Sequence, residues 1–418
     1  MIKNLLFVLL FLFIFILLVS FMMLPQLSSL NAAGRFTMLS GFALLSAFIG
    51  GKLFSRFGFP KIVGYLVVGI LYGPSVLKIF NHSDISNLNF VVQVSLGLIA
   101  VSAGSELKIS EIKKTIGTVI KVISVHLAIL PIVLGSLSFV LLKYYFSFTG
   151  GEIIIVSVLM GLVLTTASPA VPMAMISEFN LEGIFPRLTI TILVIRDILI
   201  ILFFSLILSI SNNPENAWMP LVKISLSIGI GLLLGYLFSK FVSVFNSNSE
   251  LFLIVFLLLI YKISIDLNFD YLILTLSIGF AIENYSTMGE KFLNIINQSS
   301  MPLYALFFSL AGASLEIDAL HGIGFIALLI VIVRIVFLYI STYLPMKTVK
   351  TELNLKHYLF AGFVPQAGVS IGLALLLVNG FPQYKIIGEL IIASAVFNEI
   401  IGPFIFKFAI NQYNNEVN

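Results

Sequence analysis

Long runs of apolar residues, separated by short polar stretches, make up almost the whole chain. A run of about 20 apolar residues crosses a bilayer as an α-helix, and the runs here predict about fourteen transmembrane helices. The chain therefore reads as one all-α polytopic membrane protein. The predicted spans are 4–24, 36–54, 61–80, 89–105, 115–142, 152–176, 187–210, 218–241, 250–265, 270–285, 299–314, 322–344, 356–378 and 386–410.

The first run could also be a signal peptide. Its apolar core, from Leu5 to Leu24, is longer than the usual core of roughly 7–15 residues, and no clear small-x-small cleavage site follows it. We expect a retained, extra N-terminal transmembrane helix within residues 1–35.

Two of the predicted helices carry a proline among small and polar residues. Pro169 lies in Gly161-Leu-Val-Leu-Thr-Thr-Ala-Ser-Pro-Ala-Val-Pro172, and Pro365 lies in Ala361-Gly-Phe-Val-Pro-Gln-Ala-Gly-Val-Ser-Ile-Gly372. Proline removes a helix hydrogen bond, and broken backbone at membrane depth survives only where protein or a water-filled cavity covers it. One broken helix in each half of a membrane protein points to the binding site of a secondary transporter.

The two halves also look alike. Residues 103–110 read Ala-Gly-Ser-Glu-Leu-Lys-Ile-Ser, and residues 311–318 read Ala-Gly-Ala-Ser-Leu-Glu-Ile-Asp. Each segment precedes a long helix, a broken helix and then a helix with a buried acid, Asp197 or Glu399. An odd number of spans separates the segments, so the copies run in opposite directions, which predicts inverted-topology repeats. A chance match of two short segments is the alternative.

Composition supports the membrane assignment. Apolar residues make up 59% of the chain and charged residues only 10%, against roughly 25% charged in soluble domains. Most of the 23 Lys and Arg residues fall on the side that holds both termini in this topology, which predicts cytoplasmic termini. We expect a prokaryotic cell membrane. The net charge of +4 then indicates contact with anionic lipid rather than with nucleic acid.

The sequence carries no signal of an enzyme. It has no P-loop, and its four histidines lack metal-ligand spacing, so ATP-driven chemistry and a resident cofactor are not indicated. With no cysteine, disulfides are excluded.

Ionisable residues inside membrane helices are costly, and each is therefore a candidate site residue. The clearest are Arg196, Asp197, Glu283, Arg334 and Glu399. An unpaired carboxylate in a low-dielectric surrounding is able to exchange a proton for a cation, which makes Asp197 the strongest candidate. The alternative is a permanent salt bridge from Asp197 to Arg334 or Arg196.

Alkali cations prefer oxygen ligands. The first broken helix offers the hydroxyls of Thr165, Thr166 and Ser168 close to its proline. We expect these hydroxyls to complete a cation shell around Asp197.

The remaining charges have supporting roles. Arg334 cannot deprotonate in practice, so we expect it to act as a fixed counter-charge. Glu283 is near a helix end and either faces water or is a charge partner of Arg196. Glu399 is deeper, and Arg196 is its candidate partner. For His126 we favour a packed residue over a proton relay.

Three motifs resemble the monovalent cation:proton antiporter superfamily, which includes the sodium/proton exchangers and the Kef-type potassium systems. Residues Pro60–Pro74 (Pro-Lys-Ile-Val-Gly-Tyr-Leu-Val-Val-Gly-Ile-Leu-Tyr-Gly-Pro) are similar to the family's opening helix. Residues Gly97–Ile109 are similar to its next helix, and Asn398–Pro403 to its last. The resemblance extends from about Met38 to Lys407.

The resemblance implies a homodimer, an elevator-like movement and two crossed broken helices at the ion site. It places the core ion-translocation bundle at 115–210 and 322–410, and the dimerisation scaffold at 36–105 and 250–314, with 218–241 as a linker. The essential aspartate of the family falls on Asp197, and the basic residue that precedes the second broken helix falls on Arg334.

The chain departs from the family pattern twice. The residue before the aspartate is normally Asp, Asn or Gln, but here it is Arg196. An Arg-Gly-Glu-like group usually follows the second proline, where this chain has Gln366-Ala367-Gly368. Because Arg196 leaves one acid at the paired position, we expect electroneutral exchange, and we expect Arg196 to turn towards Glu399 or Glu283.

The expected function is exchange of one Na⁺ or K⁺ for one proton. Two alternatives stay open. One is a non-transporting membrane sensor or subunit that retains the fold, which Arg196 favours. The other is a Kef-like gated channel, which the lack of a nucleotide-binding domain in the sequence disfavours.

Overall fold

The computed structural model describes residues 13–14, 16–20, 22, 32–212, 215, 218–245, 249–267, 269–285, 289–314, 322–349, 354–366 and 368–417. Within these residues there is no β-strand, and seven helices are long and apolar enough to cross a membrane, with five shorter apolar helices beside them. The all-α polytopic fold is confirmed. The helices are α3 (Ala32–Arg56), α4 (Lys61–Tyr72), α5 (His82–Asn87), α6 (Asn89–Ser105), α7 (Ile109–Val140), α8 (Glu152–Thr165), α9 (Ala170–Phe179), α10 (Ile184–Asn212), α11 (Met219–Phe245), α12 (Ser249–Asp266), α13 (Tyr271–Tyr285), α14 (Gly289–Ala313), α15 (Gly324–Met346), α16 (Gly368–Gly380) and α17 (Lys385–Val417), with short helical turns η1 (Leu141–Tyr145), η4 (Leu355–His357), η5 (Leu359–Phe363) and η6 (Pro382–Tyr384).

Most predicted spans coincide with an observed helix to within a few residues, but others differ by more. The helix predicted at 299–314 begins ten residues earlier, at Gly289, and the helix predicted at 386–410 ends seven residues later, at Val417. The span predicted at 61–80 ends at Tyr72, because Gly73 and Pro74 turn the chain and Lys78 adopts a positive φ of 55°. A residue before proline is disfavoured in a helix, which explains the stop. Most of the extra N-terminal helix predicted at 4–24 lies outside the described residues.

The two helices predicted to break, at Pro169 and Pro365, are both broken there. The first divides into α8 and α9, with 166–169 between them. The second divides into η5 and α16. The N–H of Ser168 donates to the carbonyl of Pro365 at 2.8 Å, so the two breaks cross in direct contact.

The helices around each break follow the same order. A long helix precedes each broken one (α7 and α15), and another follows it (α10 and α17). This order is the one expected of a repeat. The second of the two similar segments, 311–318, falls partly outside the described residues, so the inverted relation between the halves stays a prediction.

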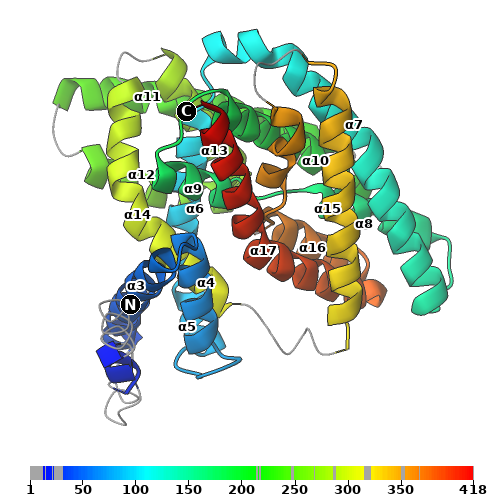
Figure 1. Ribbon diagram of the computed structural model, residues 1–418, viewed down its shortest axis with the longest axis horizontal. Helices are drawn as coiled ribbons and strands as arrows, with labels where there is room; N and C mark the ends of the chain where they lie inside the picture. Colours follow the sequence, from blue (N-terminus) through cyan, green and yellow to red (C-terminus); the bar gives the residue numbers. More distant parts are fainter. Residues whose placement is uncertain are drawn as a thin grey trace.

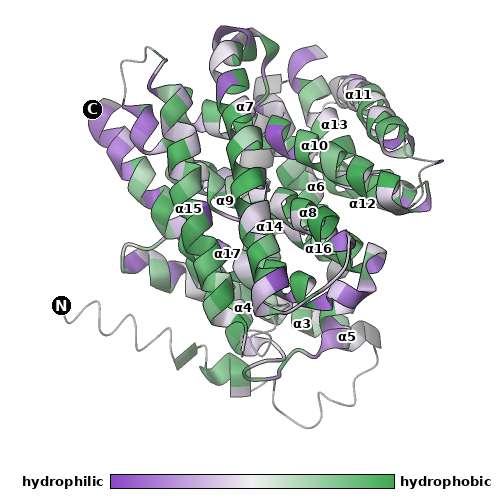
Figure 2. Cartoon of the chain, turned by 90° about the vertical axis from the view of Figure 1, so that its right-hand side faces the viewer, coloured by the Kyte–Doolittle hydropathy of each residue, from purple (hydrophilic) through white to green (hydrophobic). Residues whose placement is uncertain are grey.

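The helices pack in two groups. In one group α3 and α14 pack on α4, while α6 and α11 pack on α13; in the other, α8 and α15 pack on α7, and α15 and α16 pack on α17. Figure 1 shows α7, α8 and α15 on one side of the molecule and α3, α12 and α14 on the other. Hydrophobic residues cover the middle of the helices, and hydrophilic ones gather towards their ends (Figure 2).

Glycines permit the close approach of α6 and α13. A Cβ added to Gly279 would lie 1.9 Å from the carbonyl oxygen of Val101, and one added to Gly104 would lie 2.0 Å from that of Leu276. Small residues at such crossings let helix backbones touch, which is how membrane helices gain packing energy without a hydrophobic driving force.

Gly279→Ala should therefore destabilise the protein. The added methyl meets backbone rather than a movable side chain, and overpacking of this kind costs about 1–3 kcal/mol. The measurement is thermal unfolding of the purified protein in detergent. Gly229→Ala on α11, where nothing lies within 4 Å of the added Cβ, is the matched control and should unfold at the same or a slightly higher temperature. Equal effects of the two changes would contradict the packing argument.

Candidate functional site

Arg334 joins the two breaks. Its fully buried guanidinium donates to the carbonyls of Leu164 (2.7 Å) and Thr166 (2.8 Å) at the end of α8. It also donates to the carbonyls of Phe363 (2.9 Å) and Val364 (2.7 Å) at the end of η5. The last carbonyls of a helix lack partners within that helix and carry the negative end of its dipole. The structure places Arg334 where it satisfies both helix ends with one charge.

Two amides complete this arrangement. Gln366 donates to the carbonyl of Thr166 at 3.1 Å. Asn398 on α17 donates to the side-chain oxygen of Gln366 at 2.8 Å, and accepts from Nη1 of Arg334 at 3.3 Å. In the sequence, Asn398 stands out only as part of a motif. Its polar amide within a long apolar run is the signal that would have predicted a buried partner.

Asp197 lies beside the first break. Its side chain is 10% exposed, and its Oδ1 accepts the N–H of Ala167 at 3.4 Å. Its Oδ2 has no hydrogen-bond partner among the described residues. A buried carboxylate oxygen without a donor retains full capacity to take a proton or a cation.

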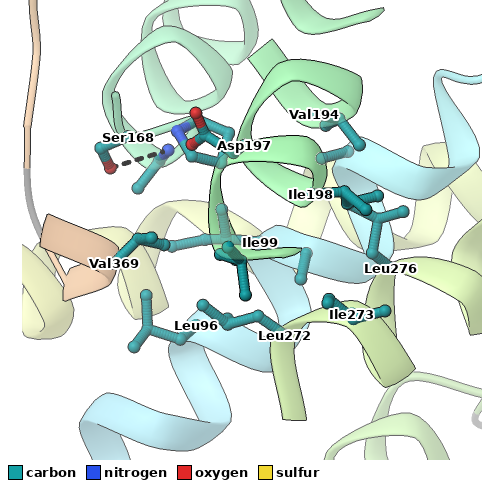
Figure 3. Close-up of a pocket in the computed structure, with 15 residues that line it drawn as sticks. Leu96, Ile99, Ser168, Val194, Asp197, Ile198, Leu272, Ile273, Leu276 and Val369 are labelled. Atoms are coloured by element: carbon teal, nitrogen blue, oxygen red, sulfur yellow. Dashed lines mark hydrogen bonds between the residues drawn. The ribbon is translucent and has the colours of Figure 1, made fainter. Parts of the chain in front are cut away.

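The carboxylate opens on a cavity of about 70 Å³ between the two groups of helices. Asp197, Ser168 and Pro169 line it from α10 and the first break, and apolar residues of α6 and α13 line the opposite wall. Figure 3 shows Asp197 and Ser168 on one side of the cavity, facing Leu96, Leu272 and Ile273. The site thus lies where one helix group faces the other.

The three hydroxyls predicted as cation ligands are placed differently. Ser168 lines the cavity with Asp197, and its Oγ accepts the N–H of Ala170 at 3.3 Å. Thr165 donates to the carbonyl of Gly161 in its own helix. Thr166 donates to the carbonyl of Val163 and lies 2.7 Å from the hydroxyl of Ser370, across the crossing point. Ser168 is the hydroxyl that the structure brings to Asp197.

Arg196 does not turn as expected. Its Nη2 lies 3.6 Å from Oδ1 of Asp197, and its Nη1 lies 3.2 Å from Nδ1 of His126. The partners proposed for it have other surroundings: Glu283 lies 3.5 Å from Lys108, and Oε1 of Glu399, on the buried side of α17, has no hydrogen-bond partner in the described part of the chain. Adjacent residues on a helix point about 100° apart, yet the Arg side chain is long enough to return to its neighbour.

Glu283 belongs to a second, wider cavity of about 650 Å³. Glu106, Lys108 and Arg187 line this cavity with it, at the end of α6 that follows the Asp197 cavity along the chain. In the topology predicted from the positive charges, this is the cytoplasmic end. The side chain of Glu283 is 5% exposed and lies against Lys108, so its expected exposure to water stays a prediction.

Comparison with known families gives a match over most of the chain. The model of the transmembrane sodium/hydrogen exchanger family matches residues 42–412. The chain belongs to the sodium/hydrogen exchanger family. K(+) efflux antiporter 5 of Arabidopsis thaliana is 29% identical over 174 residues, which are 41% of this chain and 28% of that protein. The matched region thus spans little more than a quarter of this relative.

Solved structures show the exchanger fold as well. The sodium proton antiporter MjNhaP1 of Methanocaldococcus jannaschii, in its structure at pH 8, superposes with a TM-score of 0.69 at 16% identity, covering 90% of this chain and 99% of that one. A second structure of MjNhaP1 gives a TM-score of 0.72 at 17% identity, covering 89% and 95%. The chain is therefore an integral, multi-pass membrane protein of this fold.

Arg334→Lys should destabilise this exchanger fold. A lysine ammonium has one nitrogen and cannot reach four carbonyls on two helix ends, and hydrogen bonds to a charged group contribute about 1.5–3 kcal/mol each. We expect a loss of about 3 kcal/mol or more, read as a lower unfolding temperature in detergent. Arg187→Lys is the control, because Arg187 is 51% exposed in its pair with Glu111. Similar shifts for the two variants would show that Arg334 does not hold the crossing.

Proposed function

We propose that the protein exchanges one Na⁺ or K⁺ for one proton across the membrane, electroneutrally, at Asp197. The observation that carries this proposal is the Asp197 carboxylate itself: it is buried at the crossing of two broken helices and opens on a cavity between two helix groups. Ser168 would add a hydroxyl ligand there, and Thr165 and Thr166 would support the broken backbone that presents it.

Competition between the proton and the cation for one carboxylate would couple the movement of one to the opposite movement of the other. A bare carboxylate is expensive to hold in low dielectric, whereas the protonated and the cation-bound forms are neutral. The loaded forms therefore cross more readily than the empty one, and each crossing carries either a cation or a proton. Arg334 would take no part in binding the proton or the cation, because carbonyl oxygens already engage its guanidinium. It would supply a fixed charge near the site.

Alternating access would come from movement of the core bundle (115–210 and 322–410) against the scaffold (36–105 and 250–314), with 218–241 as linker. The position of the cavity supports this division, since α6 and α13 form one wall and α10 and the first break form the other. The scaffold would also form a homodimer. Both termini would lie in the cytoplasm, with the basic loops against anionic lipid.

One observation favours a second candidate. Arg196 places a permanent charge 3.6 Å from Asp197, where a transported cation would have to bind. A protein with Asp197 already paired would not transport and would serve as a membrane sensor or subunit with the exchanger fold.

Asp197→Asn should abolish exchange and leave the protein folded. The amide cannot bind a proton and a cation in turn, although it has nearly the same shape as the carboxyl group. The measurement is dissipation of an imposed pH gradient in proteoliposomes on addition of Na⁺, K⁺ or Li⁺. Asp266→Asn, which changes an exposed pair with Lys262, should keep the wild-type rate. Wild-type exchange by Asp197→Asn would refute the mechanism, and no response of the folded wild type to any cation would favour the sensor.

Arg196→Asn tests whether the arginine restrains transport. Loss of the nearby positive charge should lower the KM for the cation by about tenfold, since a close charge pair at low dielectric interacts by more than 1 kcal/mol. The same proteoliposome assay, run over a series of cation concentrations, gives KM and the maximal rate. A variant that folds but has a higher KM than the wild type would show that Arg196 assists cation binding instead.

A further inference from the structure

His126 is a fully buried side chain on α7 that the proposed exchange does not use. Its ring joins α10 to α15: Nδ1 lies 3.2 Å from Nη1 of Arg196, and Nε2 lies 3.0 Å from Oγ1 of Thr342. The ring meets Phe363 edge-on, with centroids 5.1 Å apart. The guanidinium of Arg196 lies over the same Phe363 ring, 5.2 Å from its centroid.

The two ends of this chain of hydrogen bonds determine its direction. A guanidinium has only donors, so Arg196 donates and Nδ1 of His126 accepts. The hydroxyl of Thr342 donates its one hydrogen to the carbonyl of Leu338 at 2.7 Å, so its oxygen accepts from Nε2. His126 is therefore neutral, with its proton on Nε2.

Arg196 and Asp197 lie close together but do not form a hydrogen bond. Their separation of 3.6 Å exceeds the roughly 2.7–2.9 Å of a charge-assisted hydrogen bond, and Nε and Nη2 of Arg196 find no hydrogen-bond partner among the described residues. Arginine and carboxylate prefer a two-bond, fork-like pair. The guanidinium is instead held by its third nitrogen on His126 and by its stacking on Phe363.

We infer that His126 is a positioning residue that holds Arg196 off Asp197 and so keeps the carboxylate available to the transported cation. A neutral imidazole suits this role, because it accepts a bond from the guanidinium and leaves its charge unchanged. Without that bond, Arg196 is free to close on Asp197 and compete with the cation. This inference rests on the proposed function, since it concerns the affinity of Asp197 for that cation.

The central test is a double-mutant cycle in proteoliposomes. His126→Leu should raise the KM for the cation about tenfold, because closing a charge-assisted bond between Arg196 and Asp197 strengthens the competitor, while the maximal rate changes less. In an Arg196→Asn background, the same His126→Leu change should leave KM where Arg196→Asn alone puts it. An equal rise in KM in both backgrounds would overturn the inference, because His126 would then act without Arg196.

His126→Asn separates positioning from packing. The Asn side-chain oxygen takes the place of Nδ1 and accepts from Arg196, although the bond to Thr342 is lost. We expect this variant to bring KM back to within about threefold of the wild type. A KM as high as that of His126→Leu would overturn the inference, and so would a wild-type KM for folded His126→Leu.

The arrangement is also measurable without transport. Nitrogen-15 NMR of histidine-labelled protein, with the His126 signal assigned by its loss in His126→Asn, should show a bare Nδ1 and a protonated Nε2. The opposite tautomer or a doubly protonated ring would overturn the hydrogen-bond direction. If wild-type protein shows no exchange, the proposed function fails and the role in cation affinity fails with it, whereas the tautomer still decides the geometry.

Discussion

The fold depends on one guanidinium. Two helices are interrupted inside the membrane, and each interruption leaves carbonyl groups that lipid cannot satisfy. Arg334 donates to four of these carbonyls, two on each broken helix. Without this charge the crossing would hold several buried acceptors without donors and two negative dipole ends at close range. The crossing in turn presents Ser168 and the N–H of Ala167 to Asp197, so the candidate site depends on a residue outside its cavity.

The sequence predicted the parts of the structure that follow from local chemistry. The breaks at Pro169 and Pro365 fall where a proline stands among small and polar residues, whereas Pro131 and Pro403, in more apolar surroundings, lie inside continuous helices. Helix α6 follows from an apolar run that ends before Glu106 and Lys108. The prediction was wrong at 61–80, where hydropathy continues past Gly73 and Pro74 but helical backbone does not. Hydropathy measures where a segment prefers to lie, and turn chemistry decides where a helix ends.

Side-chain orientation could not be read from the sequence. Thr165 and Thr166 follow one another beside the break, yet their hydroxyls turn to helix carbonyls while Ser168 turns to the cavity. Arg196 was expected to turn towards Glu399 or Glu283, yet it lies against His126 and Phe363, from distant parts of the chain, with its Nη2 3.6 Å from Asp197. Such contacts are set by tertiary packing, and the spacing of residues along one sequence does not show which distant side chains meet.

Arg334 and Arg196 show how the surroundings give one residue type two roles. Carbonyl oxygens engage all three nitrogens of Arg334, so any displacement breaks several charged hydrogen bonds at once. Arg196 has one neutral acceptor, one aromatic face and an unclosed contact to a carboxylate. Displacing it breaks far fewer bonds, so a change in those few contacts is enough to alter its distance from Asp197. The two arginines beside the one acid thus differ in role. Arg334 holds the crossing of the broken helices, and Arg196 would compete with the cation that we propose binds Asp197.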